Sequence, residues 1–164
     1  MSEEKSVYEV DEPKSRVVEE KVYTVNDAVV PLLKHLEKEF MFHVWVTDKQ
    51  VAKTLEKNKF IPQATEDFLN DELPSKYDVL VVSTSTLQDK YVEKCFEYLR
   101  PFALLLPLTA LAEGKTNKLF NQHGIAAVVL DKPINFTGKK GKGECAAWFV
   151  WGVFSGNQVI FETM

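Results

Sequence analysis

Hydrophobic residues form two kinds of pattern along this chain, and the two kinds alternate. Short continuous apolar runs, several of them rich in β-branched residues, are typical of strands buried in a sheet. Longer stretches with apolar residues three and four positions apart predict helices that bury one face. The runs predict strands over residues 42–46, 60–64, 77–82, 102–106 and 125–130. The spaced pattern predicts helices over residues 24–39, 48–58, 87–99 and 108–121.

This alternation of strands and helices indicates an α/β fold, because crossover helices connect parallel strands. The last stretch differs, since residues 145–154 and 159–161 flank a turn at Ser155-Gly-Asn-Gln158 and predict a β-hairpin. We therefore expect a three-layer α/β sandwich with a mostly parallel, doubly wound sheet and a C-terminal antiparallel hairpin. Residues 21–164 are expected to form this single domain.

The net charge of −4 arises in the first part of the chain. Residues 1–20 hold seven acidic and three basic residues, so they carry the whole imbalance. This stretch has no helical periodicity, and we interpret it as a flexible acidic arm, by default a solubilising leader. A regulatory tail and a mimic of nucleic-acid charge are the alternatives. The neutral body and the scarcity of arginine argue against strong or sequence-specific nucleic-acid binding.

The location and the metal content follow from what the sequence lacks. No apolar run approaches the roughly 20 residues of a membrane helix, and the first residues have no signal-peptide core. We therefore expect a cytoplasmic protein that does not enter a membrane. Cys95 and Cys145 are expected to be buried thiols. The histidines His35, His43 and His123 are isolated, so no metal site is expected.

Every glycine in the chain lies after residue 113. Nucleotide and cofactor sites of doubly wound folds need glycine just after the first strand, where the backbone approaches the ligand. The corresponding turn here, residues 46–50, has none. A glycine-lysine loop at residues 137–143 lacks the strand-then-helix context of a phosphate-binding loop. Its lysines Lys139, Lys140 and Lys142 are candidate nucleic-acid contacts, although a solvated loop is the preferred interpretation.

Several segments, in order along the chain, resemble phage- and prophage-type adenine-specific DNA methyltransferases. They are Tyr23-Thr24 with the helix that follows, the stretch from Asp67-Phe68 to Tyr77-Asp78, residues 101–111, Leu119-Phe120 with His123-Gly124, residues 131–136, and Ala147-Trp148-Phe149 with Trp151-Gly152. The match runs from about residue 21 to the end. It implies a class I, Rossmann-like methyltransferase fold that uses S-adenosylmethionine, located in the host cytoplasm if the protein is phage-encoded.

The motifs that carry the chemistry of this family are degenerate in this chain. After the strand at residues 77–82, the family has Asn/Asp-Pro-Pro-aromatic, which holds and stacks the flipped adenine. This position holds Ser83, Thr84, Ser85 and Thr86. The acidic, glycine-containing cofactor loop corresponds to residues 46–49, which retain Asp48. The pair Asp67-Phe68 matches a site that contacts the cofactor adenine.

Asp48 and residues 83–86 also have structural interpretations. Asp48 suits the N-cap of the next helix, and residues 83–86 suit a cap-and-turn cluster. We prefer these interpretations for both.

The departures from the family pattern favour a methyltransferase-like protein that has lost catalysis and acts as a binding or regulatory module, with no cofactor. Its partner would be a protein, a second copy of the chain or, less favoured, nucleic acid. An exposed apolar face of the C-terminal hairpin is the expected interface. One alternative is an active S-adenosylmethionine-dependent adenine methyltransferase, in which Asp48 or Asp67 holds the cofactor and Ser83 orients the substrate amine. Another is a small-ligand sensor, or a different activity, on the same scaffold.

Overall fold

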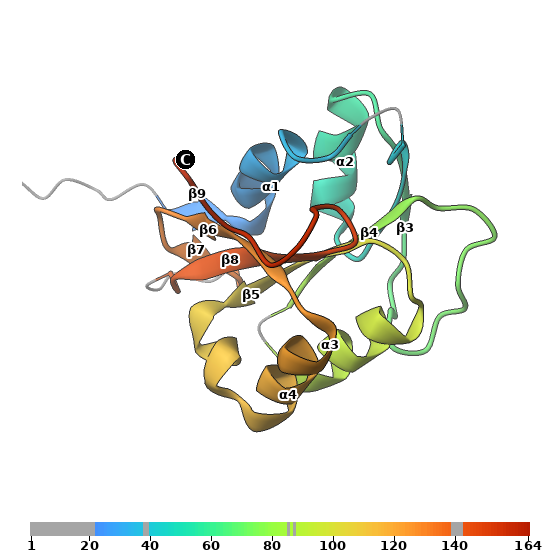
Figure 1. Ribbon diagram of the computed structural model, residues 1–164. Coiled ribbons are helices and arrows are strands. Elements are labelled where there is room, and N and C mark those ends of the chain that lie inside the picture. The colour runs from blue at the N-terminus through green and yellow to red at the C-terminus, as the bar shows by residue number, and fades with distance from the viewer. Residues whose placement is uncertain (1–21, 38–39, 85, 87, 139–142) are drawn as a thin grey trace, which may run out of the picture.

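A seven-stranded sheet crosses the centre of the molecule (Figure 1). The computed structural model describes residues 22–37, 40–84, 86, 88–138 and 143–164. The strands are β2 (His43–Val46), β3 (Ile61–Ala64), β4 (Val79–Ser83), β5 (Phe102–Pro107), β6 (Ala126–Leu130), β8 (Ala146–Trp151) and β9 (Val159–Glu162). Their order in the sheet is β3-β2-β4-β5-β8-β6-β9. Every neighbouring pair is parallel except those of β8, which runs antiparallel to β5 and β6.

Helices cover both faces of this sheet, which confirms the predicted three-layer α/β sandwich. Helices α1 (Val25–Leu33) and α2 (Lys49–Lys57) lie on one face, and α3 (Gln88–Glu97) and α4 (Gly114–His123) lie on the other (Figure 1). A short 3-10 helix, η1 (Leu108–Ala112), precedes α4. No helix among the described residues is both long and apolar enough to span a bilayer.

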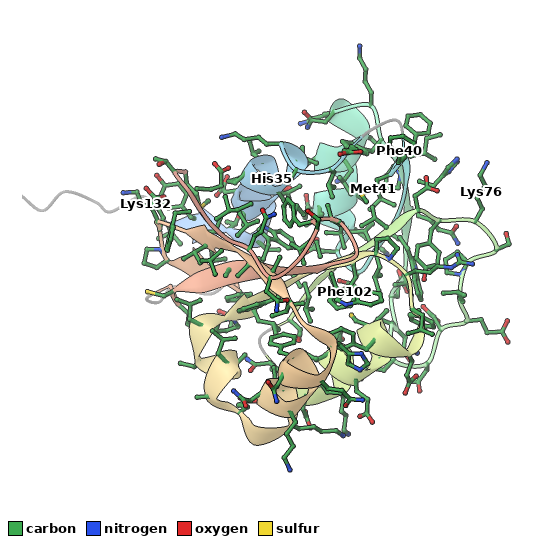
Figure 2. The ribbon with its side chains drawn as sticks, in the orientation of Figure 1. His35, Phe40, Met41, Lys76, Phe102 and Lys132 are labelled. Atoms are coloured by element: carbon green, nitrogen blue, oxygen red, sulfur yellow. The ribbon has the colours of Figure 1, made fainter. Side chains whose placement is uncertain are left out.

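The sheet separates two hydrophobic cores, because successive side chains of a strand point to opposite faces. In β2, Val44 and Val46 face the α1/α2 layer, whereas Trp45 faces the α3 layer. Strand β5 alternates in the same way, and Figure 2 shows Phe102 on the α3/α4 side. The central strands are therefore buried on both faces, which explains their continuous apolar runs.

The predicted C-terminal hairpin is wrong in its pairing. Both strands form, but β6 lies between β8 and β9, and β9 pairs parallel with β6. The first five residues of β8 are buried, so this strand needs a partner on each of its edges, and β5 and β6 supply them. The chain then passes beyond β6 through residues 152–158 and adds β9 at the edge of the sheet.

Two predicted helices are shorter than expected. Helix α1 ends at Leu33 rather than near residue 39. The N–H groups of His35 and Leu36 bond carbonyls three residues back, so tighter turns replace the α-helical hydrogen bonds there. The helix predicted at 108–121 is divided at Glu113, whose backbone is extended. The N–H of Leu108 bonds the carbonyl of Cys145 at 2.8 Å, which ties the start of η1 to the loop before β8.

Two further features were not expected from the sequence. Residues Tyr23–Thr24 (β1) pair in parallel with Ile134–Asn135 (β7) in a separate two-stranded sheet. Cys95 is buried as expected, but Cys145 is exposed. Cys145 lies just before β8, and burial begins at the next residue, Ala146.

Candidate functional site

The order of the strands reverses at β2. From β2 the chain crosses through α2 to β3 on one side, and β4 then pairs with the other side of β2. Such a switch point leaves a crevice beyond the carboxyl ends of the strands, where ligands of open α/β sheets bind. A cavity of about 180 Å³ lies at this point. It is lined by Val25, Thr47, Asp48, Thr65, Glu66, Phe68, Ser83, Thr84, Tyr91 and Phe136.

Four of the predicted site residues meet in this switch-point cavity. Asp48, Phe68, Ser83 and Thr84 all line it. Asp67 and Thr86 are exposed and are not among the lining residues. The remaining predictions, Ser85, Lys139, Lys140 and Lys142, lie outside the described residues.

Asp48 caps the helix that follows it. Its Oδ1 atom accepts hydrogen bonds from the backbone N–H groups of Gln50 (2.7 Å) and Val51 (3.4 Å). Its extended backbone is that of an N-cap residue, and α2 begins at the next residue. The interpretation of Asp48 as a helix cap is therefore confirmed, and one of its carboxylate oxygens is committed to α2.

The Ser83–Thr86 stretch leaves the end of β4 as a turn. The N–H of Ser83 donates to Thr47 Oγ1 at 3.3 Å, which joins the ends of β4 and β2. The buried hydroxyl of Thr84 donates to the carbonyl of Thr86 at 2.5 Å and accepts from its N–H at 3.2 Å. The predicted turn is thus present, and the Thr84 hydroxyl is used in holding it.

The pair Asp67-Phe68 has two different environments. Asp67 is exposed, and its carboxylate accepts from Asn70 Nδ2 at 2.8 Å. Phe68 is buried, and its ring stacks on Tyr91 with centroids 5.3 Å apart. Burial, together with the nearby Asp67 and Cys95, raises the pKa of Tyr91. Phe68 therefore belongs to the core beneath the cavity and presents little of its ring to it.

Hydroxyls and carboxylates supply the polar groups of the switch-point cavity. The carboxylates are those of Asp48 and Glu66, and no basic side chain is among the described lining residues. Lys49 pairs with Glu66 at the rim and lowers the pKa of that carboxyl. The hydroxyls belong to Thr47, Thr65, Ser83, Thr84 and Tyr91. Such a lining favours a hydroxylated or cationic group over a phosphate.

A second, larger cavity adjoins the first one and was not anticipated from the sequence. It measures about 370 Å³ and shares Val25, Asp48 and Phe136 with the switch-point cavity. Asn26 and Gln50, from the first turns of α1 and α2, add carboxamide groups to its lining. No local motif announces these residues, because only the packing of α1 beside α2 brings them together. Among the described residues, no cluster of histidine, cysteine or carboxylate side chains is arranged to hold a metal ion.

Comparison with known proteins gives structural similarity without sequence similarity. No protein-family model and no curated protein matches the chain. Among solved structures, a precorrin-6y C5,15-methyltransferase from Geobacter metallireducens is similar at 14% identity and a TM-score of 0.42, over 76% of this chain and 86% of that one. A predicted O-methyltransferase from Agrobacterium tumefaciens is similar at 7% identity and a TM-score of 0.37, over 74% and 66%.

A modification subunit assigned to a type I restriction enzyme from Vibrio vulnificus is also similar, at 8% identity and a TM-score of 0.47. The match covers 90% of this chain, which spans about half (48%) of that subunit. All three proteins are described as methyltransferases or as a modification subunit. At this level of identity the similarity concerns the fold and does not extend to a ligand or a reaction.

Proposed function

We propose that this chain is a methyltransferase-like protein that has lost methyl transfer and acts by binding a protein partner. The observation that carries the proposal is the use of the switch-point side chains within the chain itself. Asp48 caps α2, and Thr84 closes a turn onto Thr86. Methyl transfer needs both reactants held in line at near-contact distance, and groups already bonded to their own backbone are poorly placed to hold them.

The residues present do not fit S-adenosylmethionine at the switch point. The turn after β2 carries a side chain at every position from Val46 to Gln50, and each Cβ keeps a ligand from the backbone. Phe68, at the position that contacts the cofactor adenine in the resembling family, is buried against Tyr91.

The outer strand β9 has the features of a binding surface for a protein. Val159 is 63% exposed and Phe161 is 78% exposed, and both side chains lie on the same face of the strand. The carbonyls of Gln158 and Glu162 accept from the N–H groups of Ala127 (2.8 Å) and Asp131 (3.2 Å).

The backbone groups of the alternate residues 159 and 161 therefore point away from β6, toward an edge with which no strand in the described part of the chain pairs. A free edge beside exposed apolar side chains suits the addition of a partner's strand. This surface lies on the C-terminal segment for which an exposed apolar interface is expected from the sequence.

Calorimetric titration with S-adenosylmethionine, and separately with S-adenosylhomocysteine, tests the loss of catalysis. We expect no binding heat up to millimolar ligand. Micromolar binding that Asp48→Asn weakens would overturn the proposal, because Asn keeps the helix cap and changes only the charge. Asp67→Ala is the control: Asp67 is exposed and does not line the cavity, so weaker binding in this variant would indicate a binding site at the surface instead. An assay of methyl transfer to adenine-containing DNA would then measure the activity.

Photo-crosslinking tests the binding role. A photoreactive residue replaces Phe161 in one sample and Phe40 in the other. Phe40 is 69% exposed and lies across the molecule from β9 (Figure 2). In extracts of the source cells, we expect a protein adduct of defined mass from position 161 and none from position 40. An excess of the unlabelled parent chain should compete for the partner and suppress this adduct. An excess of the Val159→Asp/Phe161→Asp variant should not. Equal adducts from both positions would contradict the proposal.

A second candidate function is that of a small-ligand sensor, which the larger cavity favours. Its volume of about 370 Å³ falls within the range of ligand pockets. Phe136 offers an apolar wall, and the Gln50 carboxamide is exposed at the opening. A thermal-shift screen of uncharged small molecules tests this candidate, with a stabilising compound expected to lose its effect in Gln50→Ala.

A further inference from the structure

An apolar groove of about 210 Å³ lies between α1 and the residues that follow β9. Tyr23, Val30, Pro31 and Met164 form its apolar wall. Val30 is 56% exposed, whereas its neighbour Val29 is fully buried in the core. The outward face of a surface helix is usually polar, whereas here Val30 and the other apolar lining residues give the groove a wall that suits an apolar side chain.

We propose that residues 16–20 of this same chain dock in the groove, with Val17 and Val18 against its apolar wall. These two residues are an adjacent apolar pair in the otherwise strongly charged segment 1–21, which lies outside the described residues.

The position at which the described chain begins supports this occupant. Val22 is 55% exposed, and the next residue, Tyr23, already lines the groove. An extended chain advances about 3.4 Å per residue, so Val18 reaches at most about 14 Å from Val22. The C-terminal end lies beside α1, on the side of the molecule where β1 begins (Figure 1). The segment can therefore enter the groove without spanning the molecule.

The groove lining holds one basic residue, Lys34, and one acidic residue, Asp27, whose carboxylate accepts a hydrogen bond from the N–H of Thr24 at 2.8 Å. Glu19 and Glu20 follow the valine pair, and residues 1–20 have a balance of −4. Lys34 stands at the groove, with its side chain 61% exposed. Its ammonium already lies 3.1 Å from Glu162, and its exposed side leaves room for a second carboxylate.

The size of the groove favours a tethered occupant over a separate molecule. A stable dimer buries about 800 Å² on each partner, whereas this groove accommodates only a few side chains. A segment joined to its rim has an effective concentration in the millimolar range, which makes even a weak contact populated. The docking does not depend on the proposed function.

Methionine-methyl NMR of the full chain tests the proposal, because the chain has three methionines in three different places. Met164 lines the groove, Met41 is buried in the core, and Met1 is the first residue. We expect Val17→Ser/Val18→Ser to shift the Met164 methyl resonance and to leave that of Met41 in place. Val7→Ser/Val10→Ser changes a matched pair of valines in the same segment and should leave Met164 unchanged.

The remaining outcomes overturn the proposal. A Met164 resonance that does not move in Val17→Ser/Val18→Ser would show that these residues do not occupy the groove. An equal shift in the control variant would show a general effect of the segment. A chemical shift of the Met164 methyl group that depends on protein concentration would assign the groove to a second copy of the chain. The absence of S-adenosylmethionine binding, or of a crosslink from position 161, bears on the proposed function and leaves this test unaffected.

Discussion

The indole Nε1 of Trp148 donates a hydrogen bond of 2.7 Å to the backbone carbonyl of Ala28, in the buried layer between β8 and α1. Trp148 and Ala28 are both fully buried. The bond therefore joins the antiparallel strand to the first helix in surroundings where water cannot replace the lost partner. It helps to fix α1 over the sheet, and α1 in turn forms a wall of the groove and contributes to both cavities.

Replacing Trp148 by Phe should destabilise the fold by about 2–4 kcal/mol, through lost ring volume together with the lost hydrogen bond. Trp45→Phe is the matched control. Trp45 is equally buried, but it is held by the rings of Phe68, Tyr77 and Tyr98. Urea unfolding should give a larger loss for Trp148→Phe by about 1 kcal/mol. Equal losses would mean that the hydrogen bond adds nothing measurable.

The second prediction concerns Glu162, which ties β9 to the end of α1. Its carboxylate lies 3.1 Å from Lys34 Nζ and 2.8 Å from His35 Nε2. The hydrogen bonds from these two partners lower the pKa of Glu162 in the folded state. A lowered folded pKa contributes stability that is present above the ordinary glutamate pKa, about 4.3, and is lost as the pH falls through the lower folded value.

Stability in Glu162→Gln should therefore fall less steeply below about pH 4.3 than in the parent chain. Glu66→Gln is the control, since Glu66 pairs with Lys49 at an exposed surface where water screens the pair. Thermal unfolding midpoints measured from neutral to acidic pH provide the comparison. The prediction fails if the unfolding midpoints of Glu162→Gln and of the parent chain fall equally steeply with decreasing pH.

The sequence predicts most of the helices and strands, because the burial of each element determines which of its own residues are apolar. The run at residues 77–82 and the run at 102–106 become β4 and β5, since strands covered on both faces need apolar residues at every position. The pairing of β9 could not be predicted in this way. Residues 145–161 have the local pattern of a hairpin. However, β8 pairs with β5 on one edge and with β6 on the other, so β6 lies between β8 and β9.

The candidate site was predicted in part, for a similar reason. Asp48 follows β2 and Ser83 ends β4, and these parallel neighbours end at the same edge of the sheet, so the topology brings the two residues together. Their engagement as cap and turn residues also follows from local residue types. The larger cavity and the groove depend on how α1 packs against α2 and against the end of the chain. No spacing within the sequence records such contacts.

The third prediction concerns the two thiols. Cys95 is buried in the α3 layer, and burial raises its pKa, so it is neither accessible nor ionised at neutral pH. Cys145 is exposed before β8. A thiol-reactive chromogenic disulfide should therefore label one cysteine in the folded protein and both after unfolding. Cys145→Ser should abolish the rapid reaction, and persistence of that reaction would show that Cys95 becomes accessible in the folded state.

The last prediction compares three glycines that differ in backbone conformation and in space. Gly124 ends α4 with φ +76° and ψ 156°, a region essentially restricted to glycine. A Cβ there would lie 2.7 Å from Asn157 Oδ1, which accepts a hydrogen bond from the N–H of Ile125. Gly156 has φ +82° with open space around it, and Gly114 begins α4 with open space.

Gly124→Ala should destabilise by about 2–4 kcal/mol, because it adds backbone strain and displaces the Asn157 side chain. Gly156→Ala should lose about 1 kcal/mol, from strain alone. Gly114→Ala should be neutral or gain up to about 1 kcal/mol, since alanine favours the helix and restricts the unfolded chain. Urea unfolding of the three variants gives the order. If Gly124→Ala and Gly156→Ala lost equal stability, the Asn157 contact would have no energetic role, and the turn after α4 would depend on backbone conformation alone.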